Sequence, residues 1–183
     1  MGSKNRLMRW LGAAALIAGG SVCAVATPAE ASTVEFTDSF EGNPWNRWEG
    51  FHEGDGVAGA DLGQGLARTG ANNGWLYTGQ GWAAERIAVP VGSWGDRSNC
   101  TASIHAQPVG GGAQVGLQVW DPNGWHLLTE TYPWLGGQGY QKITTGPINV
   151  SGLSTVYVQA IYGSSSGKPQ FVRLDDVTFR CVS

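Results

Sequence analysis

Amide side chains and an aromatic ring recur on one side of the segment 114–120. Gln114, Gln118 and Trp120 alternate there with valine and leucine. Because successive side chains of a strand point to opposite faces, this period of two predicts a strand with these three groups on its outer face. Amides donate and accept hydrogen bonds, and a flat ring offers apolar area to the C–H face of a sugar. The segment therefore predicts a surface that binds a carbohydrate.

Further tryptophans extend this predicted surface. The chain has nine tryptophans, one of them at position 10, and the remaining ones exceed what the core of one small domain needs. We expect Trp82, Trp125 and Trp134 to be exposed and to contact the same ligand. The alternative is a solvated outer face, with the tryptophans packed at the bases of loops.

Acidic residues and histidines are present without a catalytic pattern. A glycosidase needs two carboxylates that face each other across the bound sugar. Four glutamates could supply such a pair: Glu49, Glu53, Glu85 and Glu130. The sequence has no Glu-x-Asp-x-Glu or His-Glu-x-x-His motif, and its three histidines lack metal-ligand spacing. We therefore expect a non-catalytic binding protein, with two alternatives: an extracellular structural or protein-binding domain, and a small glycoside hydrolase.

The first 31 residues have the layout of a secretory signal peptide. Lys4, Arg6 and Arg9 form a basic start, an uncharged stretch covers residues 10–26, and Ala29-Glu30-Ala31 has the small-residue pattern of a cleavage site. The apolar centre of this stretch is shorter than the ~20 residues that a membrane-spanning helix needs. Cleavage after the last of these alanines predicts a secreted, extracellular protein.

Residues 32–183 are expected to form one domain that stays off membranes after cleavage. They contain no Pro-rich or Ser-rich linker, no block of like charges and no internal repeat. The formal net charge is −3 and charged residues make up 14% of the chain, which argues against nucleic-acid binding and against disorder. The mildly acidic balance favours a neutral glycan over a polyanionic one, and a monomer is expected.

Two cysteines, Cys100 and Cys181, follow the predicted leader. An even number of cysteines in an exported chain predicts a disulfide. This disulfide would tie a strand in the middle of the chain to its last strand.

Short alternating segments separated by turn residues run through most of the chain. Gly110-Gly111-Gly112 and Pro122-Asn123-Gly124 are two of the turn signals between them. The number and spacing of these segments predict an all-β fold, an antiparallel β-sandwich of the jelly-roll type. The segment 41–71 is rich in Gly and Trp and poor in β-branched residues, so we predict a long structured loop there.

Three motifs stand in the order that a known group of proteins shows. Asp38-Ser39-Phe40-Glu41-Gly42 is followed by two tryptophans, Tyr140-Gln141-Lys142 begins a later segment, and Leu174-Asp175-Asp176-Val177 lies near the end. The chain resembles the secreted carbohydrate-binding modules of families four, nine and twenty-two, which are galactose-binding-like jelly rolls. The resemblance covers nearly all of the chain after the leader. It implies binding, without cleavage, of a poly- or oligosaccharide.

The same resemblance implies a structural calcium ion between the first and last strands. Its carboxylate ligands would be Glu41 and Asp175, completed by main-chain carbonyls near Asp38. Calcium takes 6–8 oxygen ligands and commonly mixes these two types. The alternative is that the two adjacent aspartates near the end of the chain cap turns or pair with nearby arginines.

Overall fold

The computed structural model describes residues 32–182, so the predicted signal peptide, residues 1–31, lies outside the described residues. Two short 3-10 helices accompany the strands, and no helix in the described range is long and apolar enough to cross a membrane. The expected all-β class is confirmed. The strands are β1 (Thr33–Asp38), β2 (Trp48–Gly54), β3 (Val57–Leu62), β4 (Asn72–Thr78), β5 (Gly81–Pro90), β6 (Cys100–Pro108), β7 (Ala113–Asp121), β8 (His126–Thr131), β9 (Trp134–Leu135), β10 (Gln141–Thr144), β11 (Thr155–Ser164) and β12 (Gln170–Val182), and the helices are η1 (Pro44–Asn46) and η2 (Gly92–Trp94).

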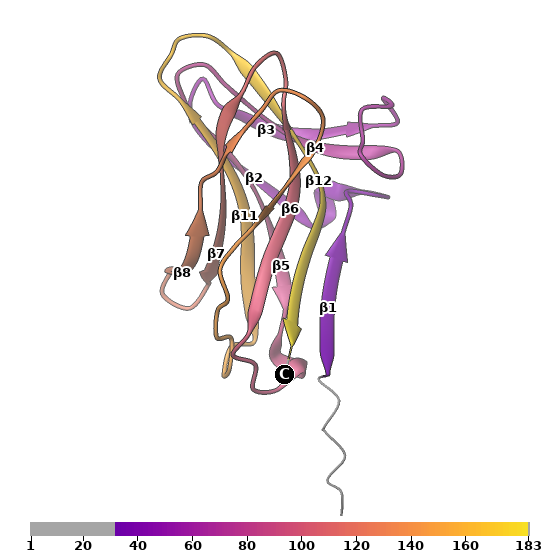
Figure 1. The fold of residues 1–183 in the computed structure, drawn as a ribbon, viewed down its shortest axis with the longest axis vertical. Coiled ribbons are helices and arrows are strands. Elements are labelled where there is room, and N and C mark those ends of the chain that lie inside the picture. Colours follow the sequence, from indigo (N-terminus) through magenta and orange to yellow (C-terminus); the bar gives the residue numbers. More distant parts are fainter. Residues whose placement is uncertain (1–31, 183) are drawn as a thin grey trace, which may run out of the picture. The chain divides into compact units, whose positions relative to one another are not determined.

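The strands form two antiparallel sheets, called here sheet A and sheet B. Sheet A has the order β10-β6-β12-β4-β3, with β1 paired to the second half of β12. Sheet B has the order β2-β5-β11-β7-β8, with the short β9 beside β7. Neighbouring strands come from distant parts of the chain: β11 lies between β5 and β7, and β12 lies between β6 and β4 (Figure 1). This is the expected antiparallel sandwich.

The space between the sheets is filled by alternate residues of their strands. Leu76, Ile104 and Phe179 of sheet A are fully buried, as are Leu117 and Val89 of sheet B. Burying such side chains contributes about 1.5–3 kcal/mol each. Because the residues between them point the other way, each sheet keeps an outer face on which polar and aromatic groups can stand.

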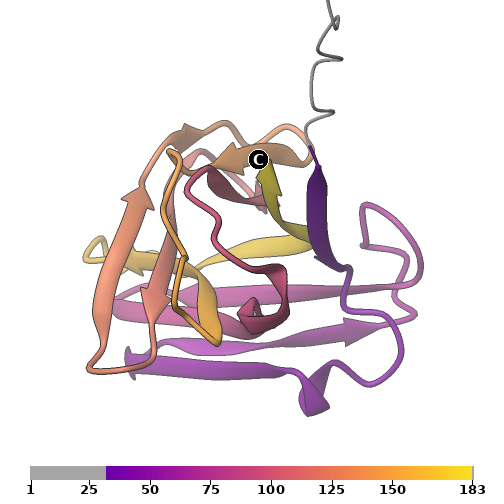
Figure 2. The ribbon, with the colours of Figure 1, turned by 90° about the horizontal axis from the view of Figure 1, so that it is seen from below.

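The first and last strands lie side by side. β1 runs antiparallel to β12 from Thr33 opposite Val182 onward, as both views show (Figures 1 and 2). The predicted disulfide is present, because Cys100 and Cys181 are directly opposite each other in the pairing of β6 with β12, and both are buried. It joins the last strand to the middle of the chain, across a sequence separation of 81 residues.

Removing both cysteines should destabilise the protein strongly. The disulfide restricts the unfolded chain, and loss of a native one typically lowers the free energy of unfolding by about 2–5 kcal/mol. Cys100→Ala with Cys181→Ala is therefore expected to show this loss in urea denaturation. Thiol titration of the unfolded, unreduced wild type should detect no free thiol, and two free thiols would contradict the pairing.

The prediction of a long loop over residues 41–71 is wrong. Two strands, β2 and β3, occupy much of this segment and pair with β5 and β4. Glycines hide the alternation because they have no side chain to mark a face. Gly59 shows why a glycine is needed there: a Cβ at this position would lie 2.7 Å from the ring of Trp75 on the neighbouring strand.

Candidate functional site

The outer face of sheet B carries three parallel rows of side chains that run across its strands. Residues directly opposite each other in antiparallel pairs share a face, so the register defines the rows. A polar row crosses five strands, from β2 to β8: Glu49, Arg86, Gln159, Gln118 and Glu130. A row with two aromatic rings flanks it on one side: Ala88, Tyr157, Trp120 and Leu127. An apolar row flanks it on the other: Phe51, Ala84, Ile161 and Gly116.

We call these three rows the platform face. Five strands are separated by four gaps of about 4.8 Å, so the polar row is roughly 19 Å long. A row of this length, with rings beside it, offers a ligand several hydrogen-bonding and stacking positions in a line. An extended oligomer fits this geometry better than a compact small molecule.

Gln118 holds the centre of the platform face together. Its Nε2 donates to Glu130 Oε2 at 3.0 Å and to Tyr132 Oη at 2.7 Å. Its Oε1 accepts from Trp120 Nε1 at 3.2 Å and from Gln159 Nε2 at 2.9 Å. An amide has two donor hydrogens and two acceptor lone pairs, so these four bonds use its full capacity. Gln118 is also buried, and it therefore positions its neighbours and leaves ligand contact to them.

Arg86 lies in a cage of aromatic rings. Its guanidinium carbon is 4.1 Å from the ring centroid of Phe51, 4.3 Å from that of Tyr157 and 4.8 Å from that of Trp125. Its Nη2 donates to Glu49 Oε2 at 2.7 Å. Cation–π contacts of this kind strengthen when they are withdrawn from water, and Arg86 is buried. The cage fixes the Tyr157 and Trp125 rings at one side of the platform face.

Trp82 marks the other end of the platform face. Its indole Nε1 donates to Glu53 Oε2 at 2.9 Å. A hollow of about 300 Å³ lies between Trp82, Gln114, Tyr132, Ile161 and Gly163. A second hollow of about 340 Å³ shares Gln114 and Gly163 with it and reaches the exposed ring of Trp134.

Tyr132 lies over the backbone of β7 because the residue beneath it is Gly116. A Cβ at Gly116 would be 2.3 Å from the Tyr132 ring, so any larger residue would displace that ring. Burial and the nearby charge of Glu130 raise the pKa of the Tyr132 hydroxyl. The group therefore stays neutral at physiological pH.

The predicted ligand-binding residues fall into three groups. Trp120 and Gln118 lie within the rows of the platform face, while Trp125 covers it from the turn between β7 and β8. Trp82 and Gln114 form the hollow at its end, and Trp134 lines the adjoining hollow. The period-two pattern had put three of these six residues on one outer face, Gln114, Gln118 and Trp120, and the structure has them on one face of β7.

Arg86 and Phe51 are members of the site that the sequence pattern did not predict. Phe51 lies in the segment predicted as a loop, although Glu49, Phe51 and Glu53 alternate there with the side chains of the opposite face. That alternation after Trp48 was the available signal. No local sequence pattern could have indicated Arg86, because its role depends on which strands lie beside β5.

Glu41 and Asp175 both bind the segment 68–72, which lies beside sheet A. Asp175 Oδ2 accepts from the backbone N–H groups of Arg68 and Thr69 at 2.7 and 3.0 Å. Glu41 Oε1 accepts from the N–H groups of Ala71 and Asn72 at 2.7 and 2.9 Å. The two carboxylates thus hold opposite ends of one five-residue segment.

The oxygen atoms near these carboxylates are of the type that calcium uses. The carbonyls of Phe40 and Gly42 converge on the side-chain Nδ2 of Asn72, at 3.3 and 3.4 Å. Burial raises the pKa of Asp175 to about 6, so a nearby cation would relieve an unfavourable buried charge. No group of three or more His, Cys, Asp or Glu side chains within residues 32–182 could hold a metal. The calcium site at Glu41 and Asp175 therefore stays a prediction, carried by two carboxylates and main-chain carbonyls, which are oxygen donors of the type that Ca²⁺ takes.

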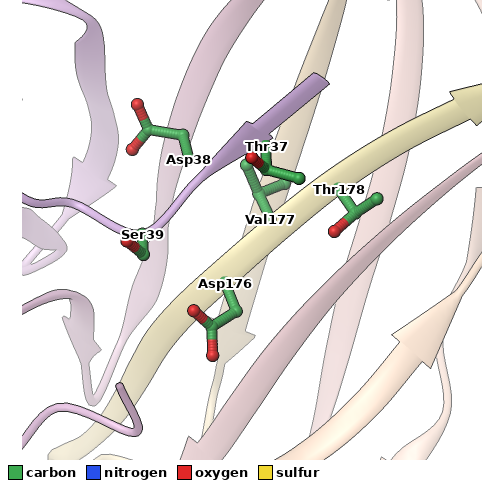
Figure 3. A pocket seen from close by; sticks show the side chains of 6 residues that line it. All are labelled: Thr37, Asp38, Ser39, Asp176, Val177 and Thr178. Atoms are coloured by element: carbon green, nitrogen blue, oxygen red, sulfur yellow. The ribbon is translucent and has the colours of Figure 1, made fainter. Parts of the chain in front are cut away.

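A hollow of about 220 Å³ lies where β1 ends beside β12, next to Asp38 and Asp176 (Figure 3). Burial alone would raise the pKa of Asp38, but hydrogen bonds from Arg47 and Trp48 outweigh it and hold that pKa below its usual value. Asp176 pairs with Arg68. Both of these carboxylates are paired with arginines, whereas Glu41 and Asp175 form no ion pair within residues 32–182, so we do not place a ligand in this hollow.

The fold is that of the β-sandwich carbohydrate-binding modules. A search of solved structures finds such modules among its matches, and the three described below are 12–16% identical to this chain, so the likeness establishes the fold. No family model matches the sequence, and a search of curated proteins finds no match.

Three of the similar structures illustrate the likeness. A family 61 module solved with β-1,4-galactotriose is 12% identical, with a TM-score of 0.53 over 77% of this chain and 92% of that one. The CBM22-1 xylan-binding domain of Paenibacillus barcinonensis is 16% identical, with a TM-score of 0.54 over 81% of this chain and 94% of that one. A family 11 module of Clostridium thermocellum, solved with a β-1,3-1,4-mixed-linked tetrasaccharide, is 15% identical. Its TM-score is 0.54 over 79% of this chain and 94% of that one.

Proposed function

We propose that the protein is a secreted, monomeric, non-catalytic carbohydrate-binding module. Its platform face would bind a neutral poly- or oligosaccharide. The observation that carries the proposal is the polar row across five strands of sheet B, from β2 to β8, with aromatic rings beside it. The row's two glutamates and Gln159, which are less buried than Gln118 and Arg86, would bind sugar hydroxyls. The rings of Trp120, Trp125 and Tyr157 would stack on sugar C–H faces.

Charge and structural likeness support a neutral glycan. Arg86 is paired with Glu49, which leaves Glu130 and Glu53 to give the platform region a negative balance. Such a surface repels polyanions. The similar structures include modules solved with galactotriose and with a mixed-linked tetrasaccharide, and a xylan-binding domain.

The carboxylates support binding without cleavage. Glu49, Glu53 and Glu130 each accept a hydrogen bond from a side chain of the site, and Glu85 is buried on the core side of β5. Acid–base catalysis by a pair needs two carboxyl groups facing one reacting bond.

Gly163–Gly167 fits the Gly-x-Ser-x-Gly pattern of a nucleophile turn. It joins two strands here, whereas that motif joins a strand to a helix.

The test is a binding panel run beside a cleavage assay. The protein is incubated with insoluble xylan, β-glucan and galactan, and depletion from the supernatant is measured together with release of reducing sugar. We expect depletion by at least one polysaccharide without sugar release. Sugar release would make the protein a hydrolase, and depletion by none would favour a protein-binding domain.

We also propose that Ca²⁺ binds at Glu41 and Asp175, with the carbonyls of Phe40 and Gly42. The bound ion would supply positive charge beside a buried carboxylate. A ligand that binds only the folded state stabilises it by RT ln(1 + [L]/Kd), about 2.7 kcal/mol at a hundredfold excess over Kd.

Chelation should therefore lower the melting temperature of the wild type. Asp175→Asn keeps one oxygen for the N–H groups of Arg68 and Thr69 but removes the charge and the oxygen that accepts from the N–H of Asp176. Its melting temperature should be lower throughout and should not respond to chelator or to added calcium. Asp176→Asn is the matched control, because it alters the neighbouring carboxylate that pairs with Arg68, and it should keep the response. Identical melting curves of the wild type in calcium and in chelator would contradict the site.

A further inference from the structure

The outer face of sheet A has a hollow of its own, on the opposite side of the sandwich from the platform face. Its volume is about 220 Å³, and it is lined by Asp61, Leu66, Trp75, Val109, Phe171 and Arg173. The strands β3, β4 and β12 supply four of these residues, and Leu66 and Val109 come from the adjoining loops. None of them belongs to the platform face or to the proposed calcium site.

An aromatic wall forms one side of this hollow. Trp75 packs on Gly59 of the neighbouring strand, where any Cβ would collide with the ring, so the indole lies close against the sheet. Phe171 meets Trp75 edge-on, with ring centroids 5.6 Å apart and an angle of 70° between the ring planes. The ring centroid of Tyr77 lies 4.6 Å from that of Phe171. These contacts fix the Trp75 ring in place before any ligand arrives, which reduces the entropy that binding would cost.

The charged groups of this hollow are available, in contrast to those of the platform face. Arg173 is directly opposite Trp75 in the sheet register, and it takes part in none of the ion pairs formed within residues 32–182. Asp61 accepts one long hydrogen bond, 3.4 Å from Asn73 Nδ2, and likewise has no ion pair among those residues. On the platform face, by comparison, Glu49, Glu53 and Glu130 already have partners.

We propose that this hollow is a second carbohydrate site, which binds a short neutral saccharide. A carboxylate accepts from two neighbouring hydroxyls, a guanidinium donates to hydroxyl or ring oxygens, and a fixed indole stacks on the sugar ring. The opposite charges of Asp61 and Arg173 cancel, which suits a neutral ligand. The hollow is smaller than the ~300–1,000 Å³ of sites for drug-sized molecules, so it takes one or two sugar rings.

Two sites on opposite faces would make the protein bivalent. A polysaccharide chain bound to sheet B and another bound to sheet A would be joined through the sandwich. The ligand class is the one proposed for the platform face, so this inference rests on the proposed function. The second site has its own residues, and its binding can be tested separately.

The test is an NMR titration that observes both sites at once. ¹⁵N-labelled protein is titrated with xylotriose, cellotriose and β-1,4-galactotriose, and the indole signals of Trp75 and Trp120 are followed. We expect the Trp75 indole and the Arg173 amide to shift with at least one trisaccharide, in the wild type and in Trp120→Ala. In Arg173→Ala the affinity measured at Trp75 should fall at least tenfold, while that measured at Trp120 is unchanged.

The possible results separate the two proposals. Shifts at Trp120 without shifts at Trp75 for all three sugars would overturn the second site and leave the platform face standing. Shifts at Trp75 without shifts at Trp120 would overturn the platform face as a sugar site and leave the second site standing. Shifts at Trp75 that persist unchanged in Arg173→Ala would also overturn it, because the hollow would then not supply the binding groups.

Discussion

Replacing Trp120 with alanine is expected to weaken glycan binding about tenfold to a hundredfold while the fold is kept. Trp120 stands on the outer face of β7, partly exposed, opposite Tyr157 of β11. Losing the apolar area of a stacked ring costs roughly 1–3 kcal/mol, which gives this range of affinity. Isothermal titration with the polysaccharide that the binding panel selects measures the change, and thermal unfolding shows that the domain remains folded.

Two further variants make this experiment decisive. Trp120→Phe keeps a ring but removes the indole N–H that donates to Gln118, so it should retain most of the affinity. Trp45→Ala removes an equally bulky, exposed ring from η1, and it should bind like the wild type. If Trp120→Ala binds as tightly as the wild type, or if it loses several kcal/mol of stability, Trp120 is not a stacking platform.

Glu85→Gln is expected to remove a pH dependence of folding stability that the wild type has. Glu85 is buried, and its Oε2 has no hydrogen-bond partner. Burial raises the pKa of this carboxyl from 4.5 to about 8. The folded state therefore holds the proton more tightly than the unfolded state does, so stability is full below pH 4.5 and is lost as the pH rises toward 8.

The size of this effect follows from the shift in the pKa of Glu85. At 1.36 kcal/mol per pKa unit the loss is about 4–5 kcal/mol. Urea denaturation of the wild type at pH 5, 7 and 9 should show it, whereas Glu85→Gln should change far less and be the more stable protein at pH 9. Glu35→Gln, which alters a glutamate on β1 at the surface, should keep the wild-type slope. Parallel profiles for the wild type and Glu85→Gln would show that Glu85 ionises as easily in the folded state as in the unfolded one.

The alternation of side chains accounts for what sequence reasoning predicted correctly. Gln114, Gln118 and Trp120 share a face because a strand has a period of two, whatever its neighbours are. The disulfide was equally accessible, since two cysteines allow one pairing. The strands β2 and β3 were not predicted, because their glycines leave few side chains to mark the two faces. Phe51 was missed with them, although it alternates with Glu49 and Glu53.

Other features depend on strand order, which no local pattern encodes. The cage around Arg86 draws Phe51, Tyr157 and Trp125 from three different parts of the chain. The role of Gln118 also changed: its position was predicted, but its amide proved to be satisfied by four neighbouring side chains. A residue type predicts which bonds are possible, while the register decides which of them the protein itself uses.

The pairing of β1 with β12 has a consequence for engineering this domain. Thr33 and Val182 are directly opposite each other, and Cys181 beside them is fixed to β6 by the disulfide. A short peptide could therefore join position 182 to position 33, and new ends could be opened in the exposed turn at Gly110–Gly111 between β6 and β7. Such a circular permutant would keep every strand pairing of both sheets. The rows of the platform face would then be presented from a different point of attachment.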